Sequence, residues 1–261
     1  MVILVALINK VALITGSSGG IGFAISKEFA ENQGATVLLC SRDINNAIRI
    51  SRRINGNTQP IELDVTNEKE VKSVVRGVIS DHGGIDILVN SAGHRFENSI
   101  WYKKYHQMTD RSLDAILEVD LKGTIHMTRA FLPSMVRKTT RFSGTSGVII
   151  NVSSTPALSG QREGAPYTIA KAAVIAVTKH IALEYGKKRI RAYTLALGNI
   201  ATDATFYSMT KGGRKQATSE PAMERWGTAE EVAKVAACLG SESFSYATGN
   251  TIIIDGGKVL V

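Results

Sequence analysis

Three polar residues in the second half of the chain have the types and the spacing for chemistry on a carbonyl group. Tyr167 and Lys171 stand four residues apart, and Ser154 comes shortly after the apolar run Val148–Ile150. In a helix, residues four apart lie on one face, and an ammonium group close to a phenol favours the phenolate. Tyr167 would then exchange protons with a carbonyl/alcohol pair, while Ser154 hydrogen-bonds the same oxygen from a strand end. A Tyr–Lys pair alone is a weak signal, so the elements around it decide its meaning.

A glycine-rich turn near the start of the chain adds a cofactor to this chemistry. The apolar run Lys10–Thr15 predicts a buried strand, Gly16–Gly22 reads Gly-Ser-Ser-Gly-Gly-Ile-Gly, and Phe23–Ala30 has the apolar spacing of a helix. Strand, glycine turn and helix together indicate a dinucleotide-binding loop, because the free N–H groups and the dipole of the helix N-terminus face the pyrophosphate. In this turn we predict cofactor contacts from Gly16, Ser18, Gly20, Ile21 and Gly22.

The end of the second predicted strand selects the cofactor. The run Ala35–Cys40 is followed by Ser41, Arg42 and Asp43. An acidic side chain at this place binds the ribose 2′-hydroxyl of NAD, whereas an arginine accommodates the 2′-phosphate of NADP. Ser41 and Arg42 favour NADP. NAD stays open as an alternative, because a small backbone shift would bring Asp43 to the ribose.

Further strands alternate with helical segments, which indicates βαβ units and a parallel sheet. Pro60–Val65 is a third strand, and Asp64 at its end has two readings: a contact with the adenine ring, or the N-cap of the helix expected over Asn67–Asp81. Asp86–Val89 is a fourth buried strand. It ends in Asn90–Gly93, whose small residues let the backbone lie against a ligand.

The rest of the chain completes an α/β fold. We expect one doubly wound Rossmann domain over residues 1–261, with a seven-stranded, mostly parallel sheet and helices on both faces. A capping box at Thr228–Glu231 opens the last helix, which runs to about Leu239. The segment 197–226 reads as irregular and too long for a simple connection, so we interpret it as a mobile substrate-binding flap. The other expected segments are a polar, aromatic surface excursion over 94–111, a helical run over 113–131, a loop over 138–147, strands over 148–152, 189–196 and 251–254, and a helix that carries Tyr167 and Lys171 to Tyr185.

Composition excludes several classes of protein. The net charge is +8, but the basic residues are scattered except at 49–53 and 187–191, and no aromatic residues interleave with them, so we interpret them as solvated surface and expect no nucleic-acid partner. No apolar run approaches 18 residues, and the apolar start, residues 1–8, lacks the basic and small-residue flanks of a signal peptide. We therefore expect no membrane partner and a cytoplasmic location. Cys40 and Cys238 read as buried free thiols, and no residues have metal-ligand spacing.

Several motifs in the same order and register resemble the short-chain dehydrogenase/reductase family, similar to 3-oxoacyl-carrier-protein reductases and glucose dehydrogenases. The resemblance extends over essentially the whole length. The motifs that carry it are 15–22, 64–65, 90–93, 151–154, 167–171 and 254–257.

The resemblance implies a role for each matching residue. Tyr167 would be the acid/base, Ser154 would hydrogen-bond the substrate oxygen, and Lys171 would bind the nicotinamide ribose. The partner would be a small carbonyl or alcohol substrate, and the protein would be a homotetramer or homodimer built on the tyrosine-bearing helix and its neighbour. Besides Tyr167, Lys171 and the residues of the glycine turn, the cofactor contacts expected are Ser41, Arg42, Asp64, Val65, Asn90, Ala92, Gly93, Gly198, Ile200 and Thr202.

Three positions depart from the family pattern. Asp120 stands where the family usually has an asparagine in the proton relay behind the lysine, and it should raise the pKa of Lys171. Leu197 replaces a proline before Gly198, and Gly19 replaces an arginine common in NADP enzymes. The first hypothesis is an NADP-preferring oxidoreductase acting on ketones or secondary alcohols, with Asp120 part of its catalytic set. The alternative is a dinucleotide-binding sensor or scaffold subunit without turnover.

Overall fold

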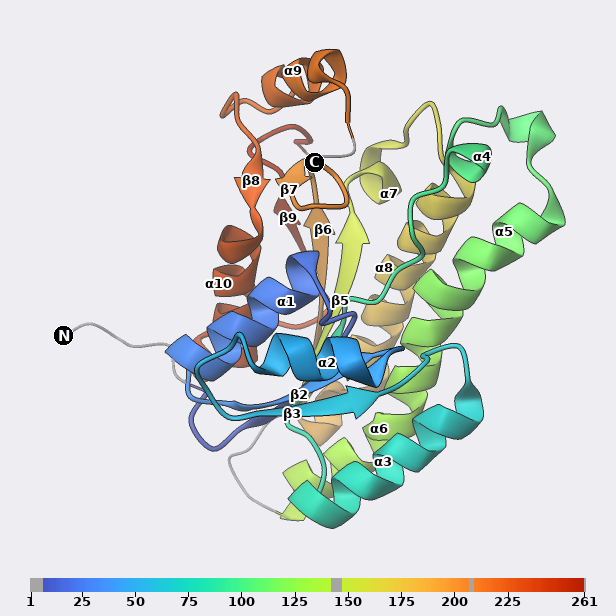
Figure 1. Cartoon of the computed structure of the whole chain (residues 1–261). Coiled ribbons are helices and arrows are strands. Elements are labelled where there is room, and N and C mark those ends of the chain that lie inside the picture. Colours follow the sequence, from blue (N-terminus) through green and yellow to red (C-terminus); the bar gives the residue numbers. More distant parts are fainter. Residues whose placement is uncertain (1–6, 142–146, 207–208, 261) are drawn as a thin grey trace.

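The computed structural model describes residues 7–141, 147–206 and 209–260 of the chain, and it centres on one parallel sheet (Figure 1). The strand order is β3-β2-β1-β4-β5-β6-β9, and every neighbouring pair is parallel, so the sheet is parallel throughout. The order reverses between β1 and β4, which is the switch point where doubly wound folds bind ligands. The strands are β1 Val11–Thr15, β2 Thr36–Ser41, β3 Thr58–Glu62, β4 Ile87–Asn90, β5 Gly147–Ser154, β6 Ile190–Leu197 and β9 Thr251–Ile254.

Helices cover both faces of the sheet, which confirms the expected fold class. One face packs against α1, α2 and α10, and the other against α3, α6 and α8. A π-helical turn, Glu28–Asn32, continues α1. The helices are α1 Gly20–Lys27, α2 Ile44–Ser51, α3 Glu68–His82, α4 Asn98–Trp101, α5 Asp110–Leu117, α6 Thr124–Arg141, α7 Pro156–Ser159, α8 Ala165–Tyr185, α9 Lys211–Ser219 and α10 Ala229–Gly240.

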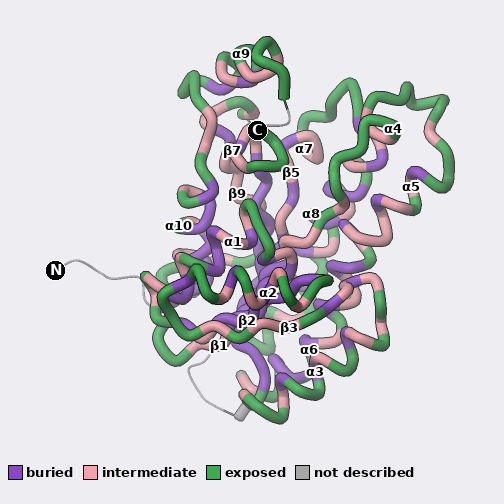
Figure 2. The backbone as a smooth tube through the Cα atoms, viewed as in Figure 1, coloured by how far each residue is buried: buried purple, intermediate pink, exposed green. Residues whose placement is uncertain are grey.

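The core lies on both sides of the sheet, and Figure 2 shows it as a buried band through the centre of the molecule. Neighbouring residues of a strand face opposite ways. Accordingly, Ile14 packs in the core beneath α1 and α10, while Leu13 packs in the core beneath α3 and α6. Because both faces are covered, β1 and β4 are almost continuous apolar runs without polar alternation.

The segment 197–226 is more regular than expected. It contains β7, Ile200–Ala201, which pairs in parallel with β8, Gly227–Thr228, and it contains the nine-residue helix α9. The Thr210 side chain caps α9 by accepting from the N–H of Gly213. Two glycines in the first turn make this helix hard to predict from the sequence, because glycine has a low helix propensity. The expectation of an irregular segment was therefore wrong.

The long helical run before β5 also differs from expectation. It begins at Asp110, where Thr109 caps α5 through Ser112, and it passes through a π-helical turn at Glu118–Gly123 before α6. The expected start at residue 113 was late because this capping box uses serine in place of the usual Glu or Gln. Since α6 runs to Arg141, the predicted loop over 138–147 begins too early, and its residues 142–146 lie outside the described part of the chain.

In the turn after β3, Asn67 and not Asp64 is the N-cap of helix α3. Asn67 caps α3, because its Oδ1 accepts from the N–H groups of Lys69 and Glu70 at 3.1 and 3.3 Å. Asp64 instead closes the turn by accepting from the N–H and hydroxyl of Thr66 at 2.9 and 2.7 Å. The reading of Asp64 as the N-cap was therefore wrong.

Smaller expectations meet mixed outcomes. The excursion over 94–111 contains no strand, as expected, but it does contain α4 and a 3₁₀ turn at Tyr105–Gln107. Both thiols are free, although only Cys40 is fully buried, and Cys238 is half-buried. No helix among the described residues is long and apolar enough to span a bilayer. Residues 1–6 of the apolar start lie outside the described residues.

Candidate active site

Helix α8 holds Tyr167 and Lys171 as the sequence predicts. Gly164 precedes the helix with φ +69°, and Pro166 stands in its first turn, a position that proline favours. Lys171 is buried and its Nζ donates to the carbonyl of Val152 in β5 at 3.2 Å. The same nitrogen lies 5.6 Å from the centroid of the Tyr167 ring. The ammonium group is thus fixed between the sheet and the phenol.

Asp120 forms a buried ion pair with this lysine. Its Oδ1 lies 2.9 Å from Lys171 Nζ, and the two side chains are only 1% and 7% exposed. Its Oδ2 accepts from the backbone N–H of His94 at 2.7 Å. Burial by itself lowers the pKa of Lys171, but the electrostatic interactions with Asp120 and Tyr167 and the hydrogen bond to Asp120 raise it by more, so the pKa of this lysine lies above its ordinary value. This direction agrees with the expectation from the sequence.

A π-helical turn presents Asp120 to the site. The turn covers Glu118–Gly123 between α5 and α6, and such turns are frequent at functional sites. Gly123 lets it approach the end of β3, since a Cβ there would lie 2.6 Å from Val65 Cγ2. Thr124 secures the turn by donating its hydroxyl to the Asp120 carbonyl at 3.0 Å.

Ser154 lies at the carboxyl end of β5, close to the same helix. Its Oγ donates to the Leu197 carbonyl of the paired strand β6 at 3.1 Å. Among the described residues no hydrogen bond joins Ser154 to Tyr167, so the hydroxyl must rotate away from Leu197 to reach a substrate oxygen. Catalytic hydrogen bonds often form only once the substrate is bound. Next to it, Ser153 Oγ donates to the Lys171 carbonyl at 2.8 Å, which ties β5 to α8.

Trp101 is a neighbour of the phenol that sequence reasoning missed. The indole lies 5.3 Å from the Tyr167 ring, centroid to centroid, with the planes tilted by 49°. It comes from α4, within the stretch that the sequence marked only as a surface excursion. An aromatic side chain in a polar segment was the available signal, but nothing in the sequence says which helix it contacts.

The glycine turn forms a tight backbone cradle at the N-terminus of α1. Gly16 has φ +68°, and a Cβ there would lie 2.9 Å from the backbone of Ala92. A Cβ on Gly22 would collide with the Gly16 carbonyl. Gly20 has φ +53°, in the left-handed region that favours glycine. The residues present therefore fit a dinucleotide, whose pyrophosphate needs close backbone approach and free N–H groups.

Thr15 connects this cradle to the end of β4, a role not foreseen from the sequence. Its Oγ1 accepts from the N–H groups of Ser91 and Ala92, both at 3.1 Å. Gly93 follows, and a Cβ there would lie 3.4 Å from Asp120 Oδ1. The backbone over 91–93 thus passes between the glycine turn and the Lys171–Asp120 pair. A buried threonine directly before the first glycine was the signal for this contact.

At the end of β2, Arg42 and Asp43 are the two candidates for a contact with the cofactor ribose, and their surroundings differ. Asp43 caps α2, with its Oδ1 accepting from the Asn45 N–H at 2.9 Å and its Oδ2 from Asn46 Nδ2 at 3.1 Å. Ser41 is buried and its Oγ accepts from the Asp43 N–H at 3.3 Å. Arg42 is exposed to solvent. The carboxylate of Asp43 is therefore already used by the helix.

The remaining predicted cofactor contacts lie around the same edge of the sheet. Thr202 lies beside the glycine turn, since a Cβ on Gly20 would be 3.5 Å from its Cγ2. Val65 is buried and its carbonyl accepts from His126 Nδ1 at 3.1 Å. Gly198 packs so closely on Asp255 that a Cβ would collide with it. Of the others, Ser18 is exposed, Ile21 packs on the core, and Ile200 is buried in β7.

Asn90 takes part in a buried polar network beneath the site. Its Nδ2 donates to Asn151 Oδ1 at 2.8 Å and to Thr128 Oγ1 at 3.2 Å, and Asn151 in turn donates to Thr178 Oγ1 at 2.9 Å. Thr194 Oγ1 donates to the same Thr178 hydroxyl at 2.8 Å. Asn90 Oδ1 has no partner in the described part of the chain. The amide nitrogen therefore holds β4 to β5, and a cofactor contact from Asn90 stays a prediction.

The described residues contain no group of three or more His, Cys, Asp or Glu side chains placed to hold a metal ion. The polar side chains at the carboxyl edge are those of an acid/base site: a phenol, an ammonium group, a hydroxyl and a carboxylate. These groups are the side chains of Tyr167, Lys171, Ser154 and Asp120.

Comparison with known proteins assigns the chain to a family. Residues 16–258 match the family described as enoyl-(acyl carrier protein) reductase. The 3-oxoacyl-[acyl-carrier-protein] reductase FabG of Thermotoga maritima is 35% identical over 255 residues, covering 97% of this chain and 98% of that protein. Glucose 1-dehydrogenase 2 of Bacillus subtilis is 29% identical, covering 97% and 96%.

A solved structure gives the same result. The crystal structure of 3-ketoacyl-(acyl-carrier-protein) reductase from Brucella melitensis complexed with NADH superposes with a TM-score of 0.86 and 31% identity, covering 97% of this chain and 99% of that one. Fold, motifs and relatives agree over nearly the whole chain. The protein belongs to the short-chain dehydrogenase/reductase family and is an oxidoreductase built to use a nicotinamide dinucleotide.

Proposed function

We propose that the protein is an NADP-preferring oxidoreductase that interconverts a small ketone and its secondary alcohol, with Tyr167 as the acid/base. The observation that carries this proposal is the fixed position of Lys171 Nζ, buried and 5.6 Å from the phenol ring, at the edge where the sheet meets the glycine cradle. An ammonium group held there serves proton transfer by the phenol.

The residues divide the work of reduction as follows. A bound nicotinamide supplies the hydride. Tyr167 donates its proton to the carbonyl oxygen, and Lys171 stabilises the phenolate that remains. Ser154 turns its hydroxyl from the Leu197 carbonyl to the same oxygen and stabilises the charge that develops there. Asp120 keeps the lysine in place. In oxidation the proton moves the other way.

The preference for NADP rests on the end of β2. Arg42 is exposed and Asp43 is engaged as the N-cap of α2, so the arginine is the side chain at the strand end that is left to meet a ribose substituent. A guanidinium matches a phosphate with paired hydrogen bonds. The glycine turn, Gly16–Gly22, would hold the pyrophosphate, and Thr202 beside it would contact the nicotinamide end.

Steady-state reduction of a ketone panel with NADPH and NADH tests both parts. We expect Tyr167→Phe to lower kcat by about 10²–10⁴-fold, the usual contribution of a general acid. Arg42→Ala should lower kcat/KM for NADPH by about 10–100-fold, the range for hydrogen bonds to a charged group, and leave NADH nearly unchanged. Arg49→Ala, an exposed arginine on α2 bonded to Asn46, is the control. A wild-type preference for NADH would refute the cofactor assignment.

A second candidate is a dinucleotide-binding sensor or scaffold subunit. The buried ion pair favours it, because Asp120 cancels much of the lysine charge that would otherwise assist the phenol. Calorimetry of dinucleotide binding, combined with steady-state rates on the ketone panel, distinguishes the two functions. Binding of the dinucleotide without turnover of any ketone, for the wild type and for Asp120→Asn alike, would favour the sensor.

We also propose that the protein assembles as a homotetramer or homodimer through α8. Several apolar side chains on this helix face solvent, among them Ile169 (39% exposed) and Leu183 (86%), and Ala176 lies between them. Val174 is buried within the protomer and is not available for such a contact. Light scattering at micromolar concentration measures the assembly. A monomer would refute it, and Leu183→Glu should dissociate the oligomer.

We further propose a cytoplasmic location. Both cysteines are free thiols, as is usual in a reducing compartment. Fractionation of the source cells with an antibody against the protein would test this, and recovery with an oxidising compartment would contradict it.

A further inference from the structure

The phenol of Tyr167 has an aromatic wall built by the segment around α4. Trp101 lies against the Tyr167 ring at 5.3 Å, and Phe96 lies against Trp101 at 5.2 Å with a tilt of 54°. Tyr102 extends the cluster outward, 6.0 Å from Phe96 and edge-on. These spacings are those at which aromatic pairs attract each other.

The backbone around Trp101 is fixed independently of its side chain. Its carbonyl accepts from the Gly164 N–H at 2.9 Å, at the residue that caps α8. Gly164 has φ +69°, and a Cβ there would lie 3.1 Å from the indole. The indole therefore occupies the space directly over the N-terminus of the helix that carries Tyr167.

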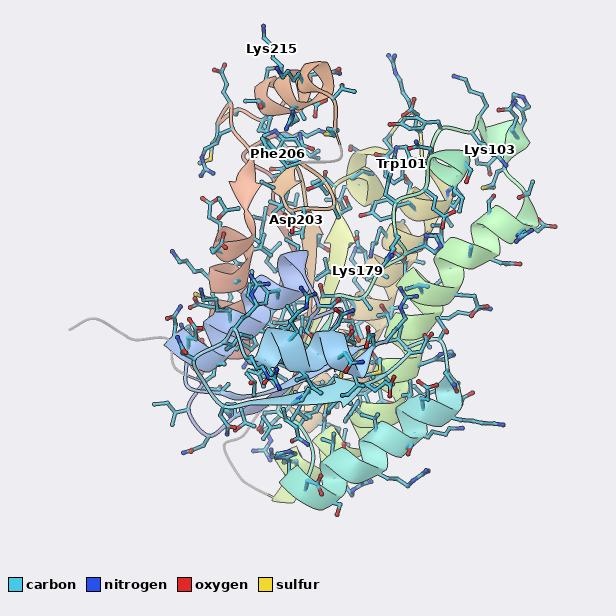
Figure 3. All side chains as sticks on the ribbon, in the orientation of Figure 1. Trp101, Lys103, Lys179, Asp203, Phe206 and Lys215 are labelled. Atoms are coloured by element: carbon cyan, nitrogen blue, oxygen red, sulfur yellow. The ribbon has the colours of Figure 1, made fainter. Side chains whose placement is uncertain are left out.

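An aromatic group also stands on the other arm of the site. Phe206 lies one turn after Thr202, the residue beside the glycine turn, and its N–H donates to the Thr202 carbonyl. The Phe206 ring packs edge-on against Trp226, with 5.2 Å between the ring centroids. Figure 3 shows Trp101 beside α4 and Phe206 below α9, on the two sides of the carboxyl edge of the sheet.

The contact between Trp101 and Tyr167 indicates which part of a substrate the indole can touch. A carbonyl oxygen hydrogen-bonded to the phenol lies about 2.7 Å from its oxygen, and the indole lies in contact with the same ring. A substituent of the carbonyl carbon that extends toward α4 would then lie beside the indole. A flat ring would stack on this surface, whereas a methyl group would cover little of it. Neither Trp101 nor Phe96 has a charged group that would reject an apolar substituent.

We infer that Trp101 is a specificity-determining residue that selects carbonyl substrates with a flat aromatic or alicyclic group on one side of the reacting carbon. This inference rests on the proposed function. It adds a substrate class to it: 3-oxo esters and ketones with a ring next to the carbonyl are preferred over linear ones. Trp101 acts by stacking on the substrate and takes no part in proton transfer.

The test compares two esters that differ only beside the carbonyl, ethyl benzoylacetate and ethyl acetoacetate. The selectivity is the ratio of their kcat/KM values, which does not depend on the fraction of active enzyme. We expect the wild type to prefer the benzoyl ester by about tenfold or more. Trp101→Ala should abolish most of this preference, and Trp101→Phe should keep part of it. Tyr105→Ala, on a ring that is 73% exposed in the same surface excursion, is the matched control and should keep all of it.

Binding without turnover separates this inference from the proposed function. Each ester is titrated by calorimetry into the protein saturated with NADP⁺, which cannot reduce it. Tighter binding of the benzoyl ester, lost in Trp101→Ala, supports the inference even if no ester is reduced, in which case only the proposed function fails. Equal binding of the two esters by the wild type, or a loss in Trp101→Ala that is the same for both, overturns it.

Discussion

Replacing Asp120 by asparagine removes one charge from a buried pair and leaves the shape of the side chain unchanged. In the wild type Asp120 Oδ1 lies 2.9 Å from Lys171 Nζ. At an effective dielectric constant of about 20, two unit charges at that distance attract by about 6 kcal/mol. Burying the two ions opposes this by several kcal/mol each, so the net value of the pair is small, whereas a lone buried charge is costly.

The variant should therefore be less stable. Breaking a buried pair by removing one partner costs about 3–5 kcal/mol, and we expect about 3 kcal/mol because asparagine keeps an oxygen that can accept from Lys171. The pKa of Lys171 is raised in the folded protein. Its stabilising contribution is thus complete below the unfolded value of about 10.4 and is lost as the pH rises through the higher folded value. The difference between wild type and variant should be greatest below about pH 10 and shrink above it.

Catalysis should respond in the opposite sense to stability. Lys171 Nζ lies 5.6 Å from the Tyr167 ring centroid, a distance at which a unit charge is worth about 3 kcal/mol, or about two pH units, at a dielectric constant of about 20. Asp120 cancels part of this effect in the wild type. Without it the charge of Lys171 acts on the phenol unopposed, so the pH midpoint of kcat/KM for alcohol oxidation should move to lower pH.

Two measurements check these expectations. Urea unfolding at several pH values gives the free energy of unfolding, and initial rates of alcohol oxidation from pH 6 to 10 give the midpoint. Asp114→Asn is the matched control, because it makes the same charge change at an exposed position of α5 and should alter neither quantity. A midpoint that stays in place or rises in Asp120→Asn would refute the electrostatic account of the site.

Three further predictions concern stability and reactivity. Gly77→Ala should raise the free energy of unfolding by about 1 kcal/mol, measured in urea, because this exposed position in α3 has open space around it and glycine is a poor helix former. Thr228→Ala should lower it by about 1 kcal/mol through loss of the cap on α10. Arg225 and the backbone N–H of Thr228 lower the pKa of Glu231 to about 2, and because the variant keeps both partners, the loss should be the same at pH 5 and pH 7. Burial raises the pKa of the Cys40 thiol, so a thiol reagent at pH 8 should label Cys238 in the native protein and both cysteines only after denaturation.

The sequence was sufficient for the fold because the signals there are local. The apolar run before Gly16 predicts β1 to within one residue, and the glycines after it predict the turn and the helix, although α1 begins three residues before the expected start at Phe23. The capping box at Thr228 likewise predicts where α10 begins. Each of these depends on residues within a few positions of one another, and covering both faces of the sheet leaves little freedom in the order of the layers.

The site was predictable in its members but not in its contacts. The spacing of Tyr167 and Lys171 follows from the helix period, and it holds in the structure. Tyr167, the ring partner of Trp101, lies 66 residues further along the chain. The hydroxyl of Ser154 in β5 donates to the Leu197 carbonyl in the neighbouring strand β6. Such pairings depend on how the elements pack, and no periodicity within an element records them. Helix α9 was missed for a different reason, since its two glycines oppose the helix that Thr210 begins.

Asp120 can be picked out from the motif around it in the sequence, but its contact with Lys171 depends on how α8 packs against the turn that carries Asp120. Burial alone lowers the pKa of Lys171, and the pair with Asp120 opposes this effect and holds the ammonium group in place. The hydrogen bond from His94 N–H anchors the carboxylate to the loop that leads into α4. That loop also carries Trp101. The carboxylate paired with Lys171 and the ring that lies against the phenol are therefore both positioned through one segment, residues 94–101.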